Sequence, residues 1–149
     1  MRGFTIIEIL IVVGMVAIIA AAVFLSLSAF RAGQDLRIAG RGAIALLRDA
    51  QSRAISQEDG NFWGVRFSHD TNNMTLWSGV TCVYGSAISS IKLKHNLEFL
   101  DPATSSKDIC FDKISGYSSA SGDVIIKLGV IGNVNETRTI TIYKNGRIE

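Results

Sequence analysis

Residues 9–25 read ILIVVGMVAIIAAAVFL, a run without one charged or strongly polar side chain. Extended to Ile6 and Phe30, the apolar stretch is long enough to span a bilayer as a helix, which needs roughly 20 residues. A helix is the state in which a single segment satisfies all its own backbone groups in hydrocarbon. The run therefore predicts a transmembrane helix, and its length argues against an ordinary core helix.

A cleaved secretory signal peptide is the rival interpretation of the same run. Arg2 supplies a positive start, and Ala20 with Ala22 would form an A-x-A cleavage site, leaving a mature chain that begins near Val23. Glu8 argues against it, because a carboxylate inside a span costs roughly 2.5–3.5 kcal/mol on insertion scales and usually has a functional partner. Snorkelling of this acid to the membrane interface is the plain alternative.

The segment Arg2-Gly3-Phe4-Thr5-Ile6-Ile7-Glu8 resembles the processing site of type IV prepilins and pseudopilins. The resemblance implies that residues 1–3 are a leader, that a prepilin peptidase cuts after Gly3, and that the new N-terminus at Phe4 is N-methylated. A glutamate at the position of Glu8 is a hallmark of this family. The resemblance also implies assembly with other pilin or pseudopilin subunits, with residues 4–30 as the transmembrane and assembly half of a helix.

The chemistry of these residues fits such processing. Gly3 has no side chain, so the backbone can enter a narrow protease cleft. Cleavage would create a positive amine at Phe4, one helical turn before Glu8. In an apolar filament core, an ion pair between this amine and the carboxylate of the same or a neighbouring chain would be little screened. Because a lone buried charge is costly, each subunit would seat in the register that pairs it.

The helical pattern continues to about Gln57, which predicts a helix roughly 80 Å long from Phe4. Apolar residues spaced by three and four mark one stripe that would pack on a head: Leu36, Ala39, Ala43, Leu47, Ala50 and Ala54. Residues 31–58 are therefore interpreted as an amphipathic, periplasmic half of the helix.

Charged residues occupy the other faces of this half: Arg37, Arg41, Arg48 and Arg53, with Asp35 and Asp49 among them. Binding of DNA or anionic lipid is one interpretation. A solvated face with local ion pairs is the simpler one, and we expect it.

After Gly60 the apolar period changes to two, which is typical of strands. We predict strands over 62–67, 74–77, 91–94 continuing into 97–100, 109–114, 123–128 and 139–143. The turn residues of 69–73 join the first two strands in a hairpin, and Asn145-Gly146 predicts a type I′ turn. The predicted fold class is α+β, a pilin fold in which a long N-terminal helix packs against an antiparallel β head of residues 59–149.

The stretches 110–125 and 138–148 resemble the head of GspH/FimT-like minor pilins. The resemblance implies a minor pilin or pseudopilin of a type IV pilus or a type II secretion pseudopilus, placed near the tip. It implies a single-pass inner-membrane protein with a periplasmic head. Some FimT-like members bind DNA through basic residues near a final glycine-arginine, so DNA uptake through Arg147 is an alternative function. The closing acid Glu149 weakens that alternative.

Cys82 and Cys110 are the two cysteines of the chain. Outside the cytoplasm a single disulfide is the simplest interpretation, and two unpaired buried thiols are the alternative. The positive-inside rule would place the head in the cytoplasm, because Arg31, Arg37 and Arg41 follow the span while Arg2 alone precedes it. The resemblance and the cysteine pair place the head in the periplasm instead.

Composition and motifs indicate no catalytic chemistry. The net charge of +2 is not that of a protein devoted to nucleic acid, which is usually distinctly basic. His69 and His95 have no partners at the spacing of a catalytic triad or a metal site. We expect no enzyme activity, cofactor, metal or small-molecule substrate, and we expect Trp63 and Trp77 to be packing residues.

Overall fold

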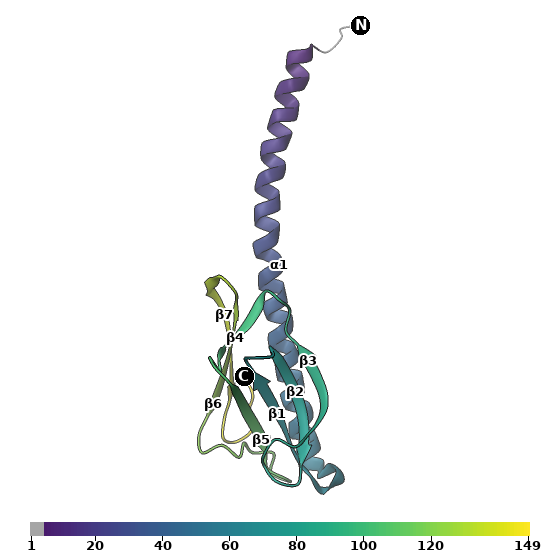
Figure 1. The fold of residues 1–149 in the computed structure, drawn as a ribbon, viewed down its shortest axis with the longest axis vertical. Coiled ribbons are helices and arrows are strands. Elements are labelled where there is room, and N and C mark those ends of the chain that lie inside the picture. Colours follow the sequence, from purple (N-terminus) through teal and green to yellow (C-terminus); the bar gives the residue numbers. More distant parts are fainter. Residues whose placement is uncertain (1–4) are drawn as a thin grey trace. The chain divides into compact units, whose positions relative to one another are not determined.

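The computed structural model describes residues 5–149, except for the side chains of 22–29 and 134. The described chain begins with helix α1 (Ile6–Ser56) and a short 3₁₀ turn η1 (Glu58–Gly60). The strands follow in the order drawn in Figure 1: β1 (Phe62–Ser68), β2 (Asn73–Gly79), β3 (Ser86–Lys92), β4 (Leu97–Asp101), β5 (Ser106–Phe111), β6 (Val124–Val130) and β7 (Asn133–Ile142).

The chain divides into two compact units, Met1–Gln34 and Asp35–Glu149, and α1 contributes to both. The described part of the first unit is helical from Ile6. Over the side chains that the structure describes, no helix combines the length and the apolar character needed to cross a membrane.

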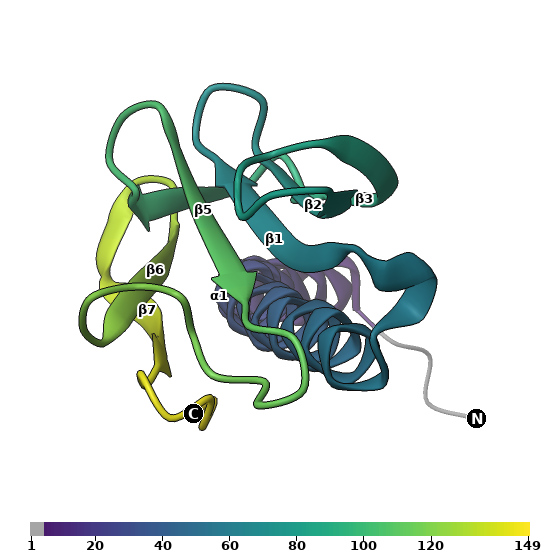
Figure 2. The same ribbon diagram turned by 90° about the horizontal axis from the view of Figure 1, so that it is seen from below.

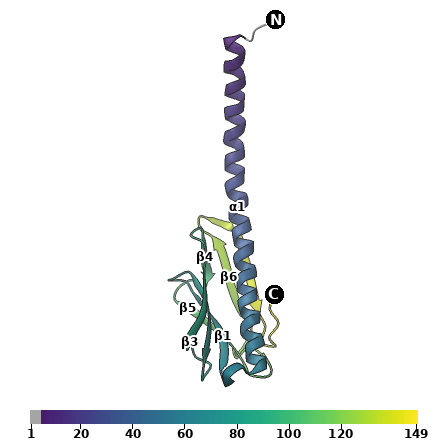
Figure 3. The same cartoon turned by 90° about the vertical axis from the view of Figure 1, so that its right-hand side faces the viewer.

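The second unit, which we call the head, contains two antiparallel sheets. The first has the strand order β3-β2-β1-β5 and the second the order β4-β6-β7. Figures 2 and 3 show these strands gathered along one side of the head segment of α1. The α+β class and the packing of antiparallel strands on a long helix are therefore as predicted.

The core of the head lies between α1 and the inner faces of the two sheets. Of the predicted helix stripe, Leu36, Ala43, Leu47, Ala50 and Ala54 are buried, and Ala39 is half-buried. Opposite them lie Trp63, Val65 and Phe67, which alternate along β1 as a half-buried strand requires. Small alanines on the helix let the sheet approach closely, and the aromatic residues of the strands fill the space.

The sequence predicted one strand continuing through residues 91–100. The structure instead has two strands here, and they belong to different sheets. β3 begins earlier, at Ser86, and pairs with β2, whereas β4 pairs with β6. A turn closed by the bond from the Leu97 amide to the Lys94 carbonyl, 3.0 Å long, carries the chain from one sheet to the other. Leu93 and Leu97 are both buried, because both sheets face the same core. An alternating apolar pattern in the sequence predicts which side chains are buried, but it does not predict which sheet a strand joins.

Two other local predictions were wrong. β5 ends at Phe111 rather than Ile114, because Ile114 has a φ of 69° and belongs to a turn. The Asn145-Gly146 turn is not type I′, because only Gly146 of the two has a positive φ, 82°. The Gly146 amide donates to the Tyr143 carbonyl at 2.9 Å, which is the pattern of a three-residue loop closed by a left-handed glycine.

Gln51 joins α1 to two turns of the head, one in the β5–β6 connection and one after β7. Its Nε2 donates to the carbonyls of Gly116, at 2.9 Å, and Gly146, at 2.8 Å. Both glycines are buried and have positive φ. A Cβ at Gly146 would collide with the Gly116 carbonyl and with the Gln51 amide, so the three groups fit only with glycine at this position.

We predict that Gln51→Ala lowers the free energy of unfolding by about 1–3 kcal/mol, because two half-buried carbonyls lose their donor. Urea denaturation of the purified chain, followed by tryptophan fluorescence, measures the difference. Ser52→Ala is the matched control, since Ser52 is the exposed neighbour on the same helix. Equal stability of the two variants would show that Gln51 does not hold these turns.

Candidate functional site

Glu8 lies in the first turn of α1 and takes part in the N-cap of the helix. Its amide donates to the carbonyl of Thr5 at 3.1 Å and to the Thr5 hydroxyl at 3.3 Å. Threonine followed three residues later by glutamate is the spacing of a capping box. The sequence interpretation gave Thr5 no role outside the processing motif. The spacing of Thr5 and Glu8 was the signal that could have predicted the helix cap. An acid in the first turn also interacts favourably with the helix dipole.

The surface around Glu8 is apolar and uncovered. All described side chains from Ile6 to Ala21 are exposed, among them Ile6 at 81%, Leu10 at 67% and Ile18 at 73%. A helix that is apolar all round is normally covered by protein or by lipid. Gly3 and Phe4 lie outside the described residues, so cleavage, methylation and the pairing of Glu8 with an amine stay predictions.

Arg53 forms the ion pair that was expected on the helix surface. Its Nε donates to Asp49 at 3.0 Å, a second nitrogen contacts Glu58 at 2.8 Å, and the guanidinium lies 4.8 Å from the centre of the Trp63 ring. The hydrogen bond to Asp49 is the main cause of the raised pKa of Arg53. These contacts fasten the end of α1 to η1 and β1.

Elsewhere on this face the expected local pairs are absent. Asp35 binds Lys94 of the β3–β4 turn at 2.5 Å, and the Lys94 hydrogen bond is the main cause of its lowered pKa. Arg37, Arg41 and Arg48 are exposed, and none of them forms an ion pair with the described side chains. The exposure of these arginines fits a solvated face, and the choice of that interpretation over DNA or lipid binding stays a prediction.

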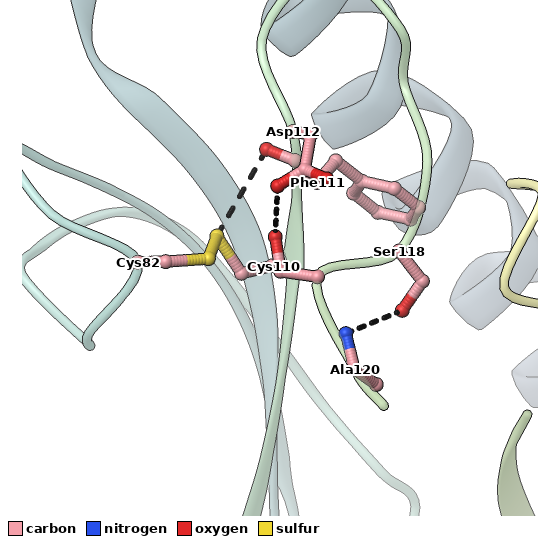
Figure 4. The surroundings of a disulfide bond; sticks show 7 residues. Cys82, Cys110, Phe111, Asp112, Ser118 and Ala120 are labelled. Atoms are coloured by element: carbon pink, nitrogen blue, oxygen red, sulfur yellow. Dashed lines mark hydrogen bonds between the residues drawn. A yellow bond between two sulfur atoms is a disulfide. The ribbon is translucent and has the colours of Figure 1, made fainter. Parts of the chain in front are cut away.

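A disulfide joins Cys82, in the loop between β2 and β3, to Cys110 on β5 (Figure 4). Because β1 lies between β2 and β5, the bond crosses β1 close to Gly64, the partner of Cys110 in the sheet. A Cβ at Gly64 would lie 2.6 Å from the Trp77 ring. The added Cβ would also collide with the Ile109 carbonyl oxygen, so glycine at this position leaves room for both the neighbouring strand and the Trp77 ring.

The outer face of β1 carries a second packed layer. Trp77 is fully buried there under Tyr84, with ring centres 6.0 Å apart. The Arg66 guanidinium lies 3.6 Å from the centre of the Tyr84 ring and binds Asp108 through two hydrogen bonds of 2.6 and 2.5 Å. The bond to Asp108 is the main cause of the raised pKa of Arg66. Trp77 is a packing residue, as expected, although its indole Nε1 is buried without a hydrogen-bond partner among the described residues.

Arg147, the candidate DNA contact, is held by its own chain. Its guanidinium lies 4.0 Å from the centre of the Tyr143 ring, and its Nε lies 3.4 Å from Glu149. The Tyr143 hydroxyl donates to the same carboxylate at 3.0 Å. The acid that weakened the DNA interpretation in the sequence is therefore next to the arginine in space.

The histidines lie apart and do not form a reactive cluster. His69 is half-buried in the β1–β2 turn, with Asp70 3.8 Å away, and His95 is exposed in the β3–β4 turn. In the part of the chain that the structure describes, no group of three or more His, Cys, Asp or Glu side chains is placed to hold a metal ion.

The fold of the chain is similar to that of two proteins of known structure. The type IV minor pilin FimU of Pseudomonas aeruginosa superposes with a TM-score of 0.62 and 16% identity, covering 78% of this chain and 87% of that one. The minor pseudopilin EpsH from the type II secretion system of Vibrio cholerae gives 0.59 and 18%, covering 77% of this chain and 94% of that one. The chain therefore has the pilin fold of these minor subunits.

Sequence comparison gives no further assignment. No protein-family model matches the chain, and no curated protein matches it. The likeness is thus one of fold.

We predict that the double variant Cys82→Ser, Cys110→Ser unfolds with a free energy about 3–4 kcal/mol lower than the native protein, because the disulfide closes a loop with a sequence separation of 28. Urea denaturation of both proteins without reductant gives the difference, and native protein with reductant should match the variant. If reductant leaves the stability of the native protein unchanged, the bond does not stabilise the head.

Proposed function

We propose that this chain is a minor pilin or pseudopilin. It is inserted in the inner membrane through α1 with its head in the periplasm, cleaved after Gly3 by a prepilin peptidase, and assembled near the tip of a type IV pilus or a type II secretion pseudopilus. One observation carries the proposal: the uncovered apolar surface of 6–21, interrupted only by Glu8, belongs to a helix on which a head of minor-pilin fold is packed.

Glu8 favours a filament subunit over a simple membrane anchor. An anchor gains nothing from a carboxylate in its apolar segment, where the charge costs several kcal/mol unless it has a partner. In a filament subunit the carboxylate can fix the register of assembly, because it is stabilised only in the position where it meets a cation. The cap formed with Thr5 uses the Glu8 amide, and among the described side chains none forms an ion pair with the Glu8 carboxylate.

The cation in this proposal is the amine that cleavage creates at Phe4. Two unit charges 4 Å apart attract by about 1 kcal/mol in water and by about 4 kcal/mol at an effective dielectric constant of 20. The pair is therefore weak at an exposed helix end and strong once neighbouring helices exclude water. Removing one partner of such a buried pair costs roughly 3–5 kcal/mol, because the other charge is left alone.

The disulfide supports a periplasmic location for the head. Disulfides persist in oxidising compartments such as the periplasm and are rare in the cytoplasm. The bond between Cys82 and Cys110 staples the β2–β3 loop onto the outer face of the first sheet, which suits a head that works outside the reducing cytoplasm.

We predict that Gly3→Leu leaves the chain unprocessed, because the side chain obstructs the backbone at the cleavage site. Intact-mass spectrometry of the membrane fraction should show residues 1–3 still attached. The native chain, by contrast, should begin at a methylated Phe4. Gly14→Leu is the matched control, since no atom lies within 4 Å of its added Cβ, and it should be processed normally. A native chain that begins near Val23 would mean a signal peptide and overturn the proposal.

We also predict that the charge of Glu8, and not its part in the helix cap, drives assembly. Glu8→Gln keeps a capping side chain and removes the charge, whereas Thr5→Ala removes the cap and keeps the charge. Glu8→Gln should lower incorporation into filaments at least about tenfold, given the cost of an unpaired buried amine. Thr5→Ala should assemble nearly as well as the native chain. Quantitative blotting of sheared filaments against the membrane pool measures both.

If Thr5→Ala were incorporated poorly and Glu8→Gln normally, Glu8 would act through helix capping alone. Normal assembly of both would remove any role for the Glu8 charge.

A further inference from the structure

Strand β3 forms an open edge of the first sheet. It pairs with β2 on one side, and Figure 2 shows no other described strand beside its outer edge. All its residues are exposed, and its sequence, SAISSIK, contains no proline and only one charge, Lys92 at its end. Exposed strand edges are normally protected by charges, proline or a covering element, because their free peptide groups bind other strands. β3 has little of this protection.

An apolar groove of about 270 Å³ runs along the core side of this same edge. It is lined by Ile38, Ala39 and Gly42 of α1 and by Met74, Ile91 and Leu97 of the β strands. Ile91 pairs with the buried Met74 and so faces the core side, yet 41% of its surface is exposed. Ile38 is 60% exposed. The first sheet therefore ends one strand short of covering the helix.

We propose that β3 and this groove bind an extended strand of another subunit of the same filament. Peptide groups of the β3 edge would pair with the incoming backbone, and every second side chain of the strand would enter the groove against Ile38 and Ile91. Such a strand completes the sheet over α1. The inference rests on the proposed function, since the partner is a filament subunit.

The size and charge of the groove define the kind of strand. Its volume lies at the low end of the roughly 300–1,000 Å³ of small-molecule sites, and its aliphatic lining beside an exposed strand edge suits a few aliphatic side chains of a strand. At its mouth Asp35 and Lys94 neutralise each other at 2.5 Å, whereas Lys92 takes part in no ion pair with the described side chains. The partner strand therefore has aliphatic residues at alternate positions and an acidic residue near Lys92.

A second copy of β3 is a poor occupant. The residues of β3 that face the core side, judged by their partners in β2, are Ser86, Ser89 and Ile91. Ile91 already lines the groove of its own chain, so another β3 would offer mainly serines to an apolar space. Ser90 points to the outer face, where its hydroxyl contacts Thr75 at 3.3 Å.

Hydrogen–deuterium exchange measured by mass spectrometry tests the inference on the full chain in detergent. The probes are the other pilin-like subunits of the same organism, purified full-length and added one at a time. Exchange of the amides in 86–92 should slow at least about tenfold with one of these subunits, as expected when free edge amides become paired. Ile91→Glu and Ile38→Glu should abolish that protection. Ile125→Glu is the matched control, because Ile125 is a strand isoleucine exposed to 47% outside the groove.

The outcomes separate the two proposals. Binding of a subunit without protection of 86–92 would overturn this inference and leave the proposed function in place. Protection of 86–92 in the chain alone at rising concentration would mean pairing with a second copy and would overturn the assigned occupant. If no subunit binds, both proposals fail. An unchanged exchange pattern in the rest of each variant shows that it is folded.

Discussion

Glu8 is a carboxylate on an apolar helical surface that no described part of its own chain covers. Such a surface is stable in lipid or against protein, and the acid is costly in both unless a cation reaches it. The Thr5 hydroxyl accepts from the Glu8 amide at the start of α1, and no described side chain forms an ion pair with the Glu8 carboxylate. A filament in which a processed N-terminus supplies the cation meets both needs, because the apolar helices cover one another and the acid is paired. In the proposed function, membrane storage and filament assembly would be two ways to cover the same surface.

The head is built so that its strands stay fixed on the helix. Gln51 holds the turns at Gly116 and Gly146, Arg53 holds the start of β1, and the disulfide holds the β2–β3 loop over Trp77. The Gln51 and Arg53 contacts lie near the C-terminal end of α1, and the disulfide lies on the outer face of the first sheet. The β3 edge has no comparable cover, and the apolar groove lies along that edge. A head whose first sheet ends in the exposed strand β3 fits the proposed role as a subunit that contacts different neighbours on different sides.

The sequence predicted what depends on periodicity. The helix, its buried alanine stripe and the β1–β2 hairpin follow from spacings of three to four and of two. It could not predict that β3 and β4 join different sheets, because Leu93 and Leu97 are buried in either case. Nor could it predict that Asp35 would bind Lys94, a residue far along the chain, rather than a helical arginine. The capping role of Thr5 was readable, but the processing motif occupies the same residues.

A structure of the assembled filament by electron cryo-microscopy, at a resolution that shows side chains, tests the central claim most directly. The Glu8 carboxylate should lie within about 4 Å of the Phe4 amine of the same or an adjacent subunit, the distance at which a water-excluded pair is strong. The apolar residues of 6–21 should be covered by neighbouring helices. A Glu8 carboxylate that faces water or lipid, with the amine of every subunit beyond hydrogen-bonding reach, would contradict the claim.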